Sequence, residues 1–270
     1  MENIKIFKNK NIKLNPYHYA LSLIKNRILW DVNYHSWISR TRLRKIKDTY
    51  KGGKAVILCN GPSLLKVDFE KLSCSGVYLI GLNKINLLFN KVDFRPDCIL
   101  AVNQFVIEQN IDFYNSTNIP IFLDSVALKC GSKSNSNITY LHTSNMRGQF
   151  ARDCSISLFV GNTVTYVAMQ LAFHMGFERV TLVGCDHDFS TKGPANQTVI
   201  SEKEDQNHFD PNYFANGVRW QLPDLFESEV AYKISSNVYE NSGRKLYNST
   251  DGGKLEILPR LSLEEFIDLP

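Results

Sequence analysis

The sequence predicts an α/β protein with a Rossmann-like, mostly parallel sheet flanked by helices, a lid loop and an N-terminal helical arm. Short apolar runs bounded by turn-forming residues recur along the chain, and such runs are typical of buried parallel strands. A helical pattern over 165–175 leads directly into one of these runs, 179–183, which makes an α/β unit. With 270 residues, the chain is near the upper size for a single core.

The first strand is predicted at 55–58, and it runs into a turn that carries Asn60, Gly61, Pro62 and Ser63. Ligands of parallel sheets collect outside the carboxyl ends of the strands. Gly61 allows close approach to the backbone, and Pro62 fixes the turn. Asn60 and Ser63 offer hydrogen-bonding side chains. We therefore expect a ligand here, although the same residues suit an ordinary turn with Ser63 near a helix N-cap.

Two further strands end in asparagine. The run 77–82 precedes Asn83, and the run 98–102 precedes Asn103. Each asparagine alone is a common turn residue. Their recurrence at the same end of the sheet favours an uncharged binding site, which suits a nucleobase, a ribose or a sugar.

The helix predicted over 165–175 has a polar entrance, Gly161-Asn162-Thr163, and Gly176 as its C-cap. Free backbone N–H groups at this entrance would suit a phosphate or a carboxylate.

The strand predicted at 179–183 ends at Gly184 and leads into Asp186-His187-Asp188. Many nucleotide-sugar transferases hold Mg²⁺ or Mn²⁺ with an Asp-X-Asp pair after a strand. Asp186 and Asp188 are therefore a candidate metal pair, although such a cluster also fits a solvated loop.

The segment 191–216 lacks apolar periodicity and is rich in Gly, Pro, Asn, Lys and Glu, so it is predicted to be a long loop outside the core. Long loops of this kind often close over active sites. Its residues His208, Tyr213 and Lys203 are able to transfer protons or to contact a negative donor. The chain then continues through a predicted helix at 224–240, a strand at 245–248, a polar loop at 248–254, a strand at 255–258 and a capped helix at 262–267.

These motifs, in their order and approximate spacing, resemble the pattern of bacterial sialyltransferases that decorate lipooligosaccharide. A similar pattern occurs in proteins named after the 6-hydroxymethylpterin diphosphokinase MptE and in flagellin-modifying glycosyltransferases that share its domain. The resemblance covers 54–190 closely and 200–267 loosely, and it specifies the fold better than the substrate. It rests on Asn60-Gly61-Pro62-Ser63, Asn83, Asn103, Gly161-Asn162-Thr163 and Gly184-Cys185-Asp186.

The sialyltransferase resemblance implies a site for a CMP-activated sugar. It places Asn60, Asn83 and Gly184 around the CMP part of the donor. It also places Asn103 near the donor sugar, and Asp186 at the ribose or cytidine. Asn162 occupies the place of a donor-binding Ser. The expected donor site is Asn60, Gly61, Ser63, Asn83, Asn103, Gly161, Asn162, Thr163, Gly184 and Asp186.

In the same resemblance the catalytic His lies in the lid, and His208 matches it. A neutral imidazole there would take the proton of an acceptor hydroxyl as its oxygen attacks the anomeric carbon. His208 also fits an exposed loop histidine. The family steadies the leaving phosphate with two lid Tyr hydroxyls. Asp188 stands in place of one and would repel a phosphate, and Tyr213 is the candidate for the other.

Charge is uneven along the chain, because residues 1–54 hold 13 Lys and Arg against 3 acids. This arm also carries aromatic and aliphatic residues. It would fit peripheral contact with an anionic membrane, packing on the domain, or pairing with a second copy. Nucleic-acid binding is not expected, because the basic residues lie outside the predicted pocket and no recognised module accompanies them.

No apolar run approaches the ~20 residues that cross a bilayer, and no signal peptide is recognised. The six Cys lack a Cys-X-X-Cys pair, which argues against a zinc cage or a disulfide framework. We therefore expect a cytoplasmic protein, with peripheral association on the inner face of the membrane as an open alternative.

The sequence thus predicts a basic arm over 1–53 and a nucleotide-sugar-binding catalytic domain over 54–270, with a lid at about 191–216. The predicted function is transfer of sialic acid or a related acidic sugar from a CMP donor to a cell-envelope glycan, as in lipopolysaccharide or capsule biosynthesis. It would proceed by direct displacement without a tightly bound cofactor. Two alternatives stay open: an MptE-like, Mg²⁺-dependent diphosphokinase acting on a pterin, and a non-catalytic nucleotide-binding protein.

Overall fold

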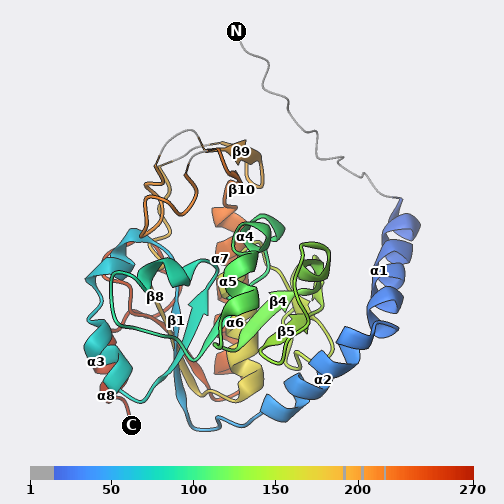
Figure 1. The fold of residues 1–270 in the computed structure, drawn as a ribbon. Coiled ribbons are helices and arrows are strands. Elements are labelled where there is room, and N and C mark those ends of the chain that lie inside the picture. The colour runs from blue at the N-terminus through green and yellow to red at the C-terminus, as the bar shows by residue number, and fades with distance from the viewer. Residues whose placement is uncertain (1–14, 191–192, 202–203, 216) are drawn as a thin grey trace.

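The computed structural model describes residues 15–190, 193–201, 204–215 and 217–270. Within them lies a seven-stranded, wholly parallel sheet in the order β11-β8-β1-β2-β3-β4-β5 (Figure 1). The predicted Rossmann-like α/β fold is therefore confirmed. The strands are β1 (Lys54–Leu58), β2 (Tyr78–Leu82), β3 (Cys98–Ala101), β4 (Ile121–Asp124), β5 (Ile138–Leu141), β8 (Arg179–Val183) and β11 (Lys245–Asn248).

The order of the strands reverses between β1 and β8. The chain adds β2 to β5 outward from β1, then returns to place β8 on the other side of β1. Pairing continues past the strand ends, since Cys59 N donates to the Val183 carbonyl and Gly61 N to the Gly184 carbonyl, both at 2.8 Å. Crevices at such reversals are where open α/β sheets bind ligands.

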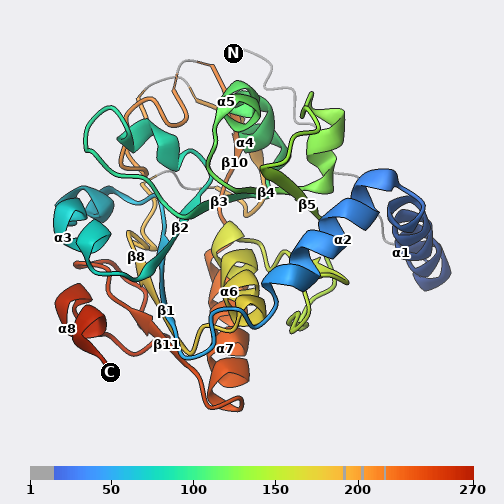
Figure 2. The same ribbon diagram turned by 60° about the horizontal axis from the view of Figure 1, so that its bottom comes forward.

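Helices cover both faces of the sheet, as Figure 2 shows. Each layer buries one alternate set of strand side chains, so every central strand is apolar on both faces. One layer holds α6 (Val164–Met175) and α7 (Leu225–Glu240). The opposite layer holds α3 (Phe69–Cys74), α4 (Gln104–Gln109), α5 (Ile111–Ser116), α8 (Leu263–Asp268) and the 3₁₀ turns Pro62–Lys66, Ile85–Leu88 and Ser125–Lys129.

The helix α2 (Tyr34–Ile46) covers the open edge of the sheet at β5. Tyr140 N of β5 donates to the Ser39 hydroxyl at 2.9 Å, and the Arg42 guanidinium donates to the Ile138 carbonyl. Leu43 of the same helix is buried in the core beside α6. These contacts replace the strand partner that β5 lacks on this side.

The helix α1 (Pro16–Asp31) stands beside α2 at the margin of the molecule (Figure 1). Its Trp30 is buried, and its Arg27 donates to the Ile156 carbonyl. Much of its apolar surface is exposed, including Leu21 at 61% and Ile24 at 55%. Contact of this arm with a membrane stays a prediction. No helix in the described ranges is both long and apolar enough to span a bilayer.

Most of the predicted elements are confirmed: β1, β2, β3, α6 with its Gly176 C-cap, β8, α7, β11 and α8 with its capping box. The strand predicted at 255–258 is wrong. Asn248 at the end of β11 instead forms a single bridge with Arg260, and Leu255 and Leu258 are buried in irregular structure.

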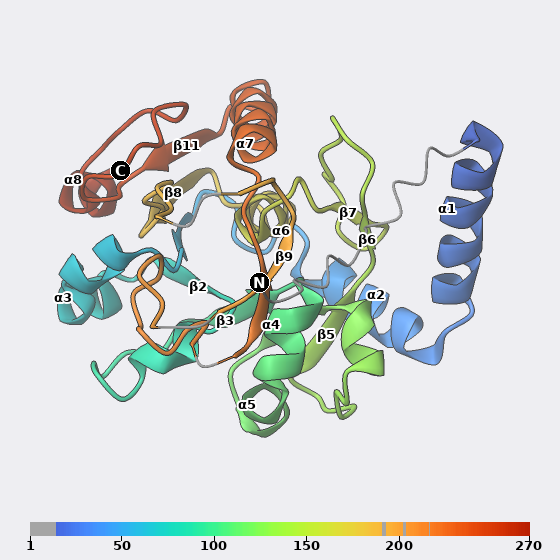
Figure 3. The same cartoon turned by 90° about the horizontal axis from the view of Figure 1, so that it is seen from above.

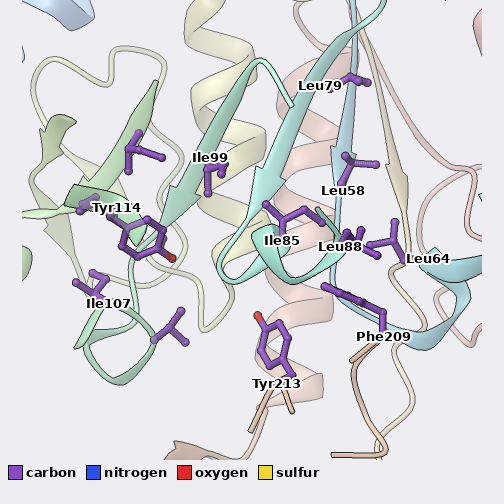
Figure 4. Close-up of a cluster of buried hydrophobic side chains, with 14 of the residues drawn as sticks. Leu58, Leu64, Leu79, Ile85, Leu88, Ile99, Ile107, Tyr114, Phe209 and Tyr213 are labelled. Atoms are coloured by element: carbon purple, nitrogen blue, oxygen red, sulfur yellow. The ribbon is translucent and has the colours of Figure 1, made fainter. Parts of the chain in front are cut away.

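The prediction that 191–216 lies outside the core is also wrong for part of its described residues. Phe209, Tyr213 and Phe214 are buried in the same cluster as Leu58 of β1 (Figure 4). Within this region β9 (Thr198–Ile200) also pairs with β10 (Arg219–Gln221) as an antiparallel hairpin. Apolar residues spaced without periodicity gave no pattern from which this packing could be predicted. Lys203 lies outside the described residues.

A buried glutamine holds the segment that precedes α6. Gln170 is fully buried, and its Oε1 accepts from the Ala151 and Phe159 N–H groups while its Nε2 donates to the Phe159 and Tyr166 carbonyls. These bonds fix the small parallel pair β6 (Thr143–Ser144) and β7 (Leu158–Phe159) beside the carboxyl end of the sheet.

Gln170→Leu should therefore lower the free energy of unfolding by roughly 2–4 kcal/mol, because it leaves buried backbone groups without partners. Chemical denaturation followed by circular dichroism measures this loss. The exposed Gln149→Leu is the matched control and should change stability little. Equal stability of the two variants would contradict the structural role of Gln170.

Candidate functional site

A cavity of about 660 Å³ opens at the carboxyl ends of the parallel strands. Figure 3 looks onto this end of the sheet, with β9 near the viewer. The turns after β8, β1, β2 and β3 and the last residue of β4 all contribute to its wall. The predicted site residues that line it are Asn60, Gly61, Asn83, Asn103, Asn162, Thr163, Gly184, Asp186, Asp188 and His208.

Three predicted site residues lie elsewhere. Ser63 is beneath Asp186, and Gly161 lines a neighbouring cavity of about 170 Å³. Tyr213 is 1% exposed and packs under His208. The predicted contact of Tyr213 with a leaving group has no support in this arrangement, because its hydroxyl does not reach the cavity.

The turns after β1 and β8 pack against each other very closely. The Ser63 hydroxyl donates to Asp186 Oδ2 at 2.8 Å. A Cβ atom on Gly61 would lie 1.9 Å from that same oxygen and 2.7 Å from the Gly184 carbonyl oxygen. Gly61 is therefore required by the contact between the two turns.

Asn60 carries a buried amide oxygen without a partner in this turn. It is 8% exposed, it lines the cavity, and its Oδ1 has no hydrogen-bond partner. Its backbone carbonyl accepts from Phe209 N at 2.9 Å, which fixes the turn to the predicted lid. A buried amide oxygen without a partner costs about 1–3 kcal/mol, and a donor group on a ligand would remove that cost.

The other asparagines have different roles. Asn83 and Asn162 adopt left-handed backbone angles, with φ of 51° and 58°, which asparagine tolerates better than most residues. Strained residues of this kind cluster at functional sites. Asn103 caps α4 through its Oδ1 and donates to Gln221 Oε1 at 3.0 Å, so its side chain is already engaged.

The two candidate metal ligands have separate partners. Asp186 accepts from Ser63, whereas Asp188 pairs with Lys254 at 3.0 Å. Among the residues that the structure describes, no group of three or more His, Cys, Asp or Glu side chains is arranged to hold a metal ion. The loop 248–254 supports Asp186 from below, because Lys254 N donates to its carbonyl at 2.8 Å.

His208 is held by a carboxylate that the sequence analysis did not single out. Its Nδ1 lies 2.7 Å from Asp205 Oδ2, and the Asp205 side chain is only 3% exposed. The imidazole stacks on Tyr213 with 4.1 Å between ring centroids and 2° between planes. In the tautomer that donates from Nδ1 to Asp205, the lone pair of the ring is on Nε2, and His208 lines the cavity. Only the Asp-X-X-His spacing could have suggested this pair.

Lys84 joins the predicted lid to the end of β2. Lys84 is 7% exposed. Its ammonium donates to the Tyr213 carbonyl at 2.6 Å and to Gln109 Oε1 at 2.7 Å. Burial lowers the pKa of Lys84 to about 8, and the nearby Asp205 charge opposes this shift. The segment that carries His208 is therefore tied to the sheet by a buried cation.

The described residues that line the cavity include no Lys or Arg. Positive potential there comes from the N-terminus of α6, where Thr163 is the N-cap and accepts from Thr165 N at 3.3 Å. The described lining thus combines polar amides and backbone N–H groups with three carboxylates, those of Asp124, Asp186 and Asp188.

Gly61→Ala should destabilise the protein, because the new methyl group would collide with Asp186 and Gly184. Thermal unfolding measures the effect. Gly76→Ala is the control: its Cβ would meet nothing within 4 Å, although its left-handed φ of 72° costs about 1 kcal/mol. A Gly61→Ala variant no less stable than Gly76→Ala would show that the two turns can separate freely.

A family profile described as "6-hydroxymethylpterin diphosphokinase MptE-like" matches residues 31–192. The matched region contains the turns after β1, β2, β3 and β8 and the entrance to α6. No curated protein matches the sequence.

Among solved structures, the MAf glycosyltransferase from Magnetospirillum magneticum AMB-1 is similar, with a TM-score of 0.49 and 14% sequence identity. The match covers 88% of this chain and 40% of that one. The chain therefore spans less than half the length of that protein.

Proposed function

The chain belongs to the MptE-like family, and from this premise we propose that it is a glycosyltransferase that uses a CMP-activated acidic sugar. The observation that carries the proposal is His208, which lines the cavity and contacts the carboxylate of Asp205. Such a pair supplies a general base, which sugar transfer to a hydroxyl requires. The resemblance to sialyltransferases supports the choice of donor and of a cell-envelope glycan as acceptor, on the cytoplasmic side.

In the proposed reaction, an acceptor hydroxyl oxygen attacks the anomeric carbon while the bond from that carbon to the phosphate oxygen breaks. CMP leaves with the bonding electron pair, and Nε2 of His208 takes the hydroxyl proton. Asp205 would hold the proton of the neutral imidazole on Nδ1, which leaves the lone pair on Nε2, and would stabilise the imidazolium afterwards. The unpartnered Oδ1 of Asn60 would accept from the nucleotide.

The charge of the cavity supports a donor with a single phosphodiester. A CMP-activated acidic sugar carries one phosphodiester charge, which would lie near the α6 N-terminus, and one carboxylate charge on the sugar, whereas the triphosphate of ATP carries several charges together and is normally bound with Mg²⁺. The described lining offers N–H groups and amides but no Lys or Arg. A singly charged phosphate is the better match for that lining.

The MptE-like diphosphokinase is the second candidate. The family description favours it, as does the presence of Asp186 and Asp188 in one cavity. With Mg²⁺ between these carboxylates, the same turns would hold ATP, and the reaction would transfer diphosphate to a pterin. In this arrangement Asp188 would have to leave Lys254.

Nucleotide binding separates the two candidates. We expect CMP to bind without metal and more tightly than UDP, GDP or ATP, because a single phosphate suits the described lining. Isothermal titration calorimetry with and without Mg²⁺ measures this. Tight binding of ATP that requires Mg²⁺ would replace the glycosyltransferase by the diphosphokinase, and no nucleotide binding at all would reject both.

His208→Ala should lower turnover by about 10²–10⁴-fold and leave CMP affinity within about twofold, since the base acts on the acceptor proton. Asp205→Asn should lower turnover less, and it should change the pH profile because it removes the charge that orients the ring. CMP release from CMP-N-acetylneuraminic acid measures both.

The exposed His18→Ala is the matched control and should behave as the wild type. Unchanged turnover in His208→Ala would show that another group is the base. An unchanged pH profile in Asp205→Asn would reduce Asp205 to a packing role.

A further inference from the structure

We propose that the end of the cavity at β4 and β6 is the subsite for the acceptor, and that it takes a neutral, hydroxyl-bearing sugar through Asp124, Thr143 and Asn145. This inference rests on the proposed function. These three residues line the same cavity as His208. The sequence analysis singled out none of them.

The two ends of the cavity differ in position along the sheet. The turn of Asn60 and the end of β8 meet at the reversal of strand order, whereas β4 lies on the far side of β2 and β3 (Figure 2). From β1 to β4 is roughly 14 Å at the usual strand spacing, which leaves room for one or two sugar rings. Both ends can therefore hold a ligand at once.

His208 lies between these ends. Phe209 N bonds to the Asn60 carbonyl after β1, and Lys84 after β2 bonds to the Tyr213 carbonyl beneath the imidazole. In a direct displacement the nucleophile and the leaving group lie on opposite sides of the anomeric carbon. A nucleotide at the reversal therefore places the acceptor on the β4 side.

Asp124 is a buried carboxyl group in the wall of this end. It is 9% exposed, its Oδ1 accepts from Val126 N at 2.7 Å, and its Oδ2 accepts from the Thr143 hydroxyl at 2.5 Å. These bonds fix its orientation and leave acceptor lone pairs on both oxygens. Fixed carboxylate oxygens are suited to accept from sugar hydroxyl groups.

The charge of this end selects against anionic sugars. Burial already raises the pKa of Asp124, so a second carboxylate beside it would be costly in a poorly solvated site. The described residues of the cavity offer no Lys or Arg to offset that repulsion. A neutral sugar with hydroxyl donors avoids the cost, and Asn145 adds an exposed amide at the rim.

The test follows CMP release from CMP-N-acetylneuraminic acid in water alone and with added lactose, N-acetylglucosamine or glucuronic acid. Wild type, Asp124→Asn, Asn145→Ala and the exposed surface control Asp112→Asn are compared. Calorimetry on the CMP-loaded protein measures sugar binding independently of turnover. Asn145 is exposed, so Asn145→Ala reports on the subsite even if Asp124→Asn folds poorly.

We expect lactose or N-acetylglucosamine to speed CMP release by wild type and by Asp112→Asn, and glucuronic acid to have less effect. In Asp124→Asn, the concentration of neutral sugar needed to speed CMP release should rise at least tenfold. This change should be at least tenfold larger than any change in the rate of CMP release to water. Asn145→Ala should show a smaller shift in the same direction.

Three results would overturn the subsite. The first is that both cavity variants depend on sugar concentration as the wild type does. The second is that Asp124→Asn loses CMP release to water as much as CMP release to the sugar, and the third is that no neutral sugar binds or changes the rate. CMP release to water without a sugar effect would reject the subsite and leave the transferase in place. The absence of both CMP binding and CMP release would reject the proposed function, and the subsite with it.

Discussion

The contact between the turns after β1 and β8 is the constraint on which the site depends. Gly61 N bonds to the Gly184 carbonyl, and Asp186 accepts from Ser63 across the same gap. The two strands are neighbours only because the chain reverses its direction of growth at β1. The other features of the cavity are arranged around this contact, from the buried amide of Asn60 to the loop that bonds to Asp186.

A second constraint comes from the segment that carries His208. Phe209 and Tyr213 are buried in the core (Figure 4), and Lys84 bonds to the Tyr213 carbonyl. The imidazole of His208 consequently lies on tightly packed side chains, and its Nδ1 contacts Asp205. The position of His208 is thus fixed by apolar burial and by one buried cation.

The turns that face the cavity could be predicted from sequence because each follows a short apolar strand, as at Asn60, Asn83 and Gly184. Partners that depend on tertiary structure could not. Asp205 and Asp124 are ordinary acidic residues until folding brings Asp205 to His208 and Asp124 to Thr143. Gly61 was expected to make room for a ligand, and the structure shows that it makes room for Asp186. Phe209 and Tyr213 lie in a stretch whose composition is typical of loops, so their burial depends on contacts distant in sequence.

The covering of β5 by α2 has a consequence for how the protein behaves in a crowded solution. An uncovered parallel edge is a template on which another chain can add a strand. Ser39 and Arg42 occupy that template at β5, and at the opposite edge Asn248 of β11 bonds to Pro259 and Leu261. The β5 edge and the end of β11 at Asn248 are thereby closed to strand addition. The helix that precedes the first strand thus blocks the addition of a further strand at β5.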